Sequence, residues 1–95
     1  MEIEVTPEAA EVLLRSFQLA GIDPTSGGVR LRPARGLGGG VSVQIEFAAA
    51  PGAEEEVVET AGVRLFVTAD LPDAVPNPVV AVEPQHDRVV VRPRS

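Results

Sequence analysis

The residues best suited to chemistry in this chain surround a glycine-rich run, GLGGG, at positions 36–40. Backbone N–H groups of successive glycines can form a concave nest that binds an anion. Three arginines precede or adjoin the run, and their guanidinium groups would add positive charge to such a nest. The candidate anion site therefore comprises Arg30, Arg32, Arg35, Gly38, Gly39 and Gly40.

The same run also fits a plain connection between two strands, flanked by solvated arginines. It lacks the Lys-Ser/Thr ending of a phosphate-binding P-loop, and no helical pattern follows it. A small anion-binding module is therefore one hypothesis for this region, and a flexible hairpin connection is the other.

The one histidine of the chain, His86, stands beside Asp87 in a segment predicted to be a turn. Imidazole and carboxylate can both ligate a metal, and a histidine can also titrate near neutral pH. The competing interpretation is an exposed turn histidine without a role. His86 and Asp87 are accordingly the candidate metal ligands.

Other polar groups give weaker patterns. The glutamates at 54–56 together with Glu59 could supply oxygens to Ca²⁺ or Mg²⁺, but they lack the spaced Asp/Asn-Gly pattern of a dedicated loop. A run of like charges is more typical of a solvated segment. No serine stands in a nucleophile-elbow motif. We therefore predict no catalytic residues and no enzyme.

Composition excludes several classes of function. The 95 residues include no cysteine, which removes disulfides, thiolate-held clusters and thiol nucleophiles. The net charge of −6 argues against nucleic acid and anionic membranes as partners. No apolar stretch is long enough to span a bilayer, and no signal peptide is evident. The expectation is a soluble cytoplasmic protein without a cofactor.

One domain with a single long helix follows from the hydrophobic pattern. Thr6 and Pro7 form a helix start, and Gly21 is a stop, which predicts a helix over 7–20. Alternating apolar residues predict short strands, of which 41–47 is the clearest, and Pro33 limits central pairing of the strand before it. We expect an α+β, β-rich fold over 1–95, with the helix packed on mixed or antiparallel strands.

The order of these segments resembles the HesB-like, or A-type (IscA-like), iron-sulfur cluster carrier family. The resemblance runs through four segments: VTPEAAEVLLRSF, GVRLRPARGLGGGVSVQIEF, VVETAGVRLFVTAD and PVVAVEPQHDRVVVRP. It implies the fold of that family over nearly the whole chain. Family members hold iron or a cluster with three cysteines, one of which would fall near Gly38. The C-terminal Cys-Gly-Cys segment has no counterpart here.

The resemblance and the missing cysteines together suggest a non-enzymatic domain that has lost its thiolate ligands. An accessory role beside iron-sulfur assembly proteins would follow, with the anion-binding module as the alternative. Self-association, as a dimer, is also expected, because family members commonly oligomerise. The valine-rich strands at 41–45 and 89–91 exceed what one helix covers, so they form either a dimer interface or a core shared by two sheets.

Overall fold

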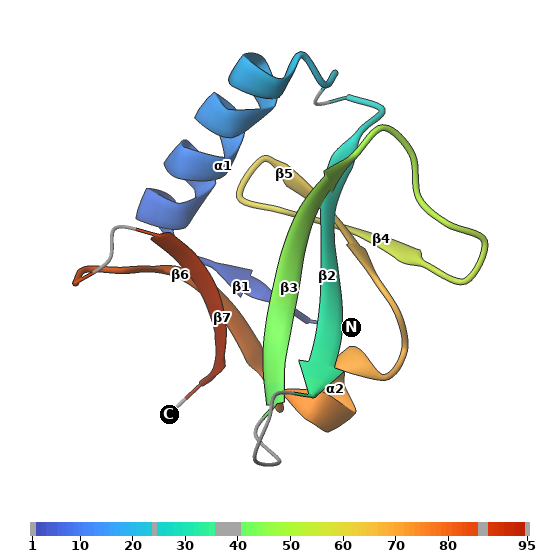
Figure 1. Ribbon diagram of the computed structural model, residues 1–95, viewed down its shortest axis with the longest axis vertical. Coiled ribbons are helices and arrows are strands. Elements are labelled where there is room, and N and C mark those ends of the chain that lie inside the picture. The colour runs from blue at the N-terminus through green and yellow to red at the C-terminus, as the bar shows by residue number, and fades with distance from the viewer. Residues whose placement is uncertain (1, 24, 36–40, 86–87, 95) are drawn as a thin grey trace.

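The computed structural model describes residues 2–23, 25–35, 41–85 and 88–94, without the side chains of Arg35 and Val41. One long helix and seven strands account for most of this part of the chain (Figure 1). The elements are β1 (Glu4–Val5), α1 (Pro7–Ala20), β2 (Gly28–Arg35), β3 (Val41–Ala48), β4 (Glu56–Thr60), β5 (Val63–Val67), α2 (Leu71–Ala74), β6 (Pro78–Glu83) and β7 (Arg88–Pro93). The predicted α+β, β-rich fold is confirmed.

Helix α1 begins and ends where the sequence predicts. The Thr6 hydroxyl oxygen accepts a hydrogen bond from the Ala9 N–H at 3.2 Å, and Pro7 occupies the first turn. Gly21 ends the helix in the left-handed conformation, with φ at 70°. The apolar face of α1 is buried, with Leu13 and Phe17 nearly inaccessible to solvent.

The strands form two separate mixed sheets. The larger sheet has the order β3-β2-β5-β4, in which only the β2–β5 pair is parallel. Strand β2 pairs with β5 only from Val29 to Leu31, whereas its pairing with β3 continues to Arg35. Because Pro33 has no N–H to donate, it lies where β2 has one neighbour, as predicted. The smaller sheet has the order β1-β6-β7, with β1 parallel to β6.

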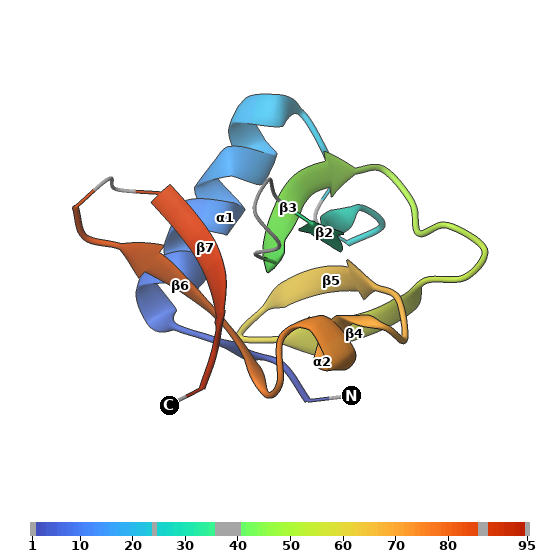
Figure 2. The same cartoon turned by 60° about the horizontal axis from the view of Figure 1, so that its bottom comes forward.

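A single apolar cluster joins both sheets to α1. Helix α1 contacts β5 in the larger sheet and β6 in the smaller one (Figure 2). Buried residues from all three layers meet there, including Phe17, Leu65 and Val80. On β3 and β7, Val43, Ile45, Val89 and Val91 are partly buried against this cluster. Their contacts favour the shared-core interpretation of the valine-rich strands.

Candidate functional site

Arg30 and Arg32 lie on the outer face of β2, because the alternating residues Val29 and Leu31 are buried. The antiparallel register places Glu46 of β3 opposite Arg30, and Gln44 opposite Arg32. The structure therefore brings two of the three predicted arginines to one face. Their surroundings on that face differ.

Glu55 holds the Arg30 guanidinium at two points. The Arg30 Nε lies 2.7 Å from Glu55 Oε2, and Arg30 Nη2 lies 3.0 Å from Glu55 Oε1. Glu46 is a more distant partner at 3.8 Å. The Glu55 side chain is only 9% exposed, and its Oε1 also accepts the Gly52 N–H at 2.5 Å. Arg30 thus fixes the turn that precedes β4.

Both members of this pair have altered titration. The hydrogen bonds from Arg30 lower the pKa of Glu55 below its usual value, and burial opposes this shift only in part. The same hydrogen bonds raise the pKa of Arg30. Both groups are therefore charged at neutral pH, and most of the Arg30 donor edge is already occupied.

Arg32 is the arginine on this face whose guanidinium could still bind an anion. It is exposed and forms no ion pair within the described part of the chain. It borders an open hollow of about 480 Å³ with Arg30, Gly52, Glu54 and Thr68. One guanidinium facing such a hollow could hold a small anion, although the carboxylates of the 54–55 turn lie at the same rim.

The rest of the predicted anion site lies outside the described residues. This applies to Gly38, Gly39, Gly40 and the Arg35 side chain. The candidate metal ligands His86 and Asp87 also lie outside them. Both sites therefore stay predictions.

Two of the four glutamates at 54–56 and 59 form ion pairs with arginines. Glu55 binds Arg30, and Glu59 binds Arg64 with a 2.7 Å contact between its Oε1 and Nη1. Among the described residues, no three His, Asp or Glu side chains come close enough to hold a metal ion. The structural role of Glu55 was missed from the sequence, where it lies among adjacent glutamates with nothing to single it out.

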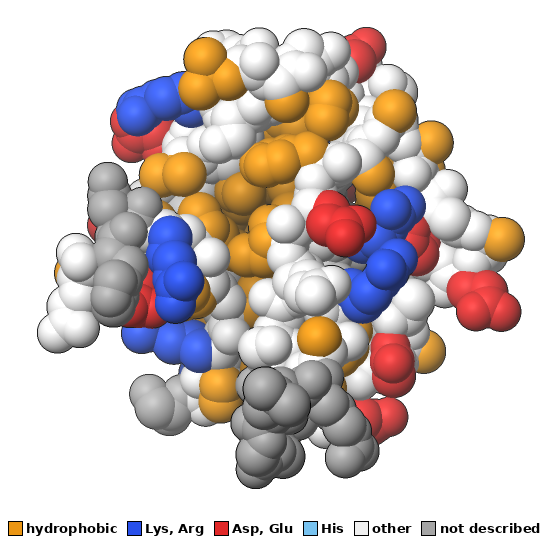
Figure 3. Space-filling model, in the orientation of Figure 1, with side chains coloured by type: hydrophobic (Ala, Val, Ile, Leu, Met, Phe, Trp, Pro, Cys, Tyr) orange, Lys and Arg blue, Asp and Glu red, His pale blue; other side chains and the backbone are white. Residues whose placement is uncertain are grey.

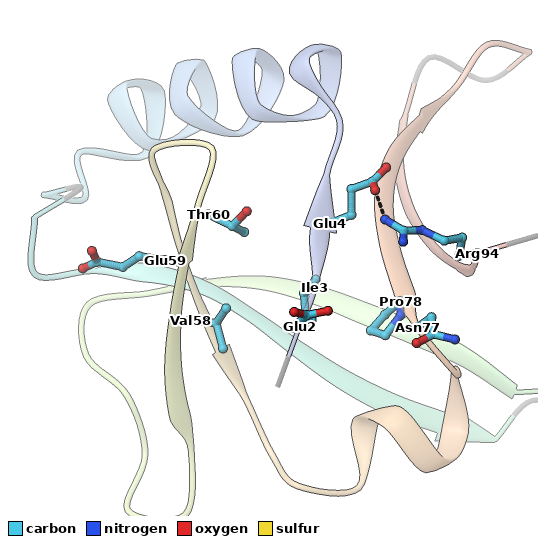
Figure 4. A pocket seen from close by; sticks show the side chains of 9 residues that line it. All are labelled: Glu2, Ile3, Glu4, Val58, Glu59, Thr60, Asn77, Pro78 and Arg94. Atoms are coloured by element: carbon cyan, nitrogen blue, oxygen red, sulfur yellow. Dashed lines mark hydrogen bonds and ion pairs between the residues drawn. The ribbon is translucent and has the colours of Figure 1, made fainter.

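A second hollow, of about 350 Å³, separates the two sheets where β1 approaches β4 (Figure 4). Val58 and Thr60 point from β4 toward β1, whereas Glu59 points to the opposite side. On the β1 side, Glu4 forms an ion pair with Arg94 near the C-terminal end. Edge strands of the two sheets approach each other here without pairing, as β3 and β7 also do.

Solved structures with the same arrangement of elements are known. A crystal structure of IscA with a [2Fe–2S] cluster superposes with a TM-score of 0.74 at 16% identity, over 96% of this chain and 82% of that chain. Escherichia coli SufA, involved in the biosynthesis of iron-sulfur clusters, gives 0.68 at 20% identity over 95% and 76%. A protein from Aquifex aeolicus gives 0.70 at 19% identity over 97% and 91%.

This chain has the HesB-like, A-type fold. The resemblance inferred from the sequence is thereby confirmed at the level of the fold. No protein-family model matches the sequence, and no curated protein matches it. None of the helices in the described part of the chain is long and apolar enough to cross a membrane.

The donor atoms of this chain do not fit an iron-sulfur cluster. Clusters are held by cysteine thiolates, with histidine as the known replacement. The chain has no cysteine, and its single histidine is His86. The remaining polar side chains are carboxylates, guanidinium groups, hydroxyls and amides, and none of these is a soft ligand.

Proposed function

We propose that this chain is a single HesB-like domain, residues 1–95, that has lost the cluster ligands of the carriers it resembles. It has no enzymatic activity and acts through contacts with other proteins. The observation that carries this proposal is a fold shared with IscA and SufA in a chain without cysteine. Fold alone does not assign a function. The loss of cluster binding is therefore inferred from the missing cysteine thiolates.

The partners proposed are iron-sulfur assembly proteins in the cytoplasm. An apolar surface between α1 and β3 supports a role in binding proteins. Leu14 of α1 and Phe47 of β3 are each 36% exposed. The Phe47 ring packs edge-on against the Phe17 ring, with 5.2 Å between the two ring centroids. Apolar side chains also gather in the hollow between α1, β7 and β3 (Figure 3). A domain with this surface but without the cysteine ligands would bind where a carrier binds, and it would transfer no cluster.

Direct binding tests this role. The purified chain is mixed with cluster-loaded SufA and, separately, with cluster-loaded IscA, and each mixture is followed by sedimentation velocity and by cluster absorbance. Mixed complexes are expected, without transfer of the cluster to this chain. Phe47→Glu should weaken them, whereas Leu19→Glu, at a side chain that is 84% exposed on α1, should not. Absence of complexes with both proteins would contradict the role.

An anion-binding module is the second candidate, favoured by the exposed Arg32 beside its hollow. Inorganic phosphate should then raise the melting temperature by mass action. Arg32→Ala and Arg35→Ala should each remove the rise, whereas Arg15→Ala, on an exposed helical ion pair, should keep it. A melting temperature independent of phosphate would eliminate this candidate.

A further inference from the structure

Each sheet ends in strands that are paired on one side only. These are β3 and β4 in the larger sheet, and β1 and β7 in the smaller one. The unpaired N–H and C=O groups of an edge strand are a template for another strand. Two of these edges, β4 and β7, have complementary charge.

The outward face of β4 is apolar and acidic. Val58 packs against the core, so its neighbours Val57 and Glu59 face away from it. The Val57 side chain is 37% exposed. The acidic turn at 54–55 precedes the strand. This edge therefore offers one uncovered valine between the acidic turn and Glu59, whose carboxylate also binds Arg64.

The corresponding face of β7 is apolar and basic. Val89 and Val91 are partly buried against the core, so Arg88, Val90 and Arg92 lie on the opposite face. The Arg88 Nε atom lies 3.9 Å from the carboxylate of Glu83. Arg92 forms no ion pair within the described residues. The basic edge is unexpected in a chain with a net charge of −6.

Neither edge suits pairing with its own copy. An antiparallel β7–β7 pair centred on Val90 would place Arg88 opposite Arg92 of the second copy, and like charges directly opposite each other are destabilising. A β4–β4 pair would bring together two acidic edges, because Arg30 and Arg64 neutralise only two of the four glutamates at 54–56 and 59. The two edges instead complement each other.

We propose that this protein assembles head to tail, with β7 of one copy adding to the free edge of β4 in the next. With Val57 opposite Val90, Glu59 lies opposite one of the two arginines, and the 54–55 turn lies beside the other. This match holds for parallel and antiparallel pairing alike, because Arg88 and Arg92 are equally distant from Val90. Backbone hydrogen bonds join the strands, and the two valines cover each other.

The position of the two edges decides the type of assembly. Strands β4 and β7 lie on different sides of the molecule in both ribbon views (Figures 1 and 2). A contact between two different surfaces repeats from copy to copy and gives a ring or an open fibre. The assembly is therefore not limited to a dimer, and salt weakens it because its ion pairs are exposed.

Charge-reversal variants test this contact by sedimentation velocity over a range of protein concentrations. The first variant combines Arg88→Glu with Arg92→Glu, and the second carries Glu59→Arg. Each alone should raise the dissociation constant for self-association by about tenfold or more. An equimolar mixture should assemble again, because each variant then supplies the edge that the other lacks. Val57→Asp, which leaves every ion pair intact, should also weaken the assembly.

Matched controls reverse charges on α1, away from both edges. Arg15→Glu and Glu8→Arg should associate as the wild type does, and circular dichroism confirms that every variant is folded. A monomeric wild-type protein at the highest concentration, or a mixture that stays dissociated, would overturn the proposal. The outcome is independent of binding to IscA or SufA, so either proposal can fail alone.

Discussion

Arg30 on β2 and Glu55 before β4 are 25 residues apart in the sequence, yet they form a two-point ion pair in the fold. The pair joins the outer face of the larger sheet to the turn that leads into its edge strand. Gly52 completes the turn by donating its N–H to the same carboxylate. The carboxylate is nearly buried, so the contact is more than a loose surface pair.

Glu55→Gln should lower the melting temperature by about 4–8 °C, the shift expected for losing one such contact in a domain of this size. The amide keeps the shape of the side chain but removes the charge that Arg30 binds. Thermal unfolding followed by circular dichroism measures the shift. Glu54→Gln is the matched control, and equal melting temperatures for the two variants would contradict the role of Glu55.

The contribution of Glu55 should depend on pH. Arg30 holds the pKa of this carboxyl below its usual value of 4.5, so the folded state binds the proton less well than the unfolded state. The stabilisation is therefore complete above about pH 5 and is lost as the pH falls through the folded pKa. The melting-temperature difference between wild type and Glu55→Gln should shrink in acid. A difference that stays constant down to pH 3 would exclude this linkage.

Local signals in the sequence were sufficient to predict the long helix and most of the strands. Thr6, Pro7 and Gly21 set the limits of α1 because capping depends on neighbouring residues. The parallel β2–β5 and β1–β6 pairs could not be predicted, since each joins strands far apart in the sequence. Glu55 was unpredictable for the same reason. The division into two sheets with free edges is also a property of the whole chain.

The turn between β4 and β5 offers a test of backbone strain. Ala61 and Gly62 both have positive φ, 54° and 78°, as a two-residue hairpin turn requires. Alanine in this conformation carries a steric cost that glycine avoids. Ala61→Gly should therefore raise the stability by about 1 kcal/mol, measured by urea unfolding. Ala53→Gly, at an exposed position without positive φ, should not, and a destabilised Ala61→Gly variant would refute the strain.

Reconstitution tests most directly whether this protein has lost the cluster chemistry of the carriers that share its fold. The protein is incubated anaerobically with iron and sulfide, desalted, and examined by metal analysis and absorption spectroscopy. Without tryptophan, tyrosine or cysteine, the protein itself absorbs little in the near-ultraviolet and visible range, so a bound cluster would stand out. We predict no retained iron and a blank spectrum. Near-stoichiometric iron with cluster absorbance would contradict this loss and direct mutagenesis to His86.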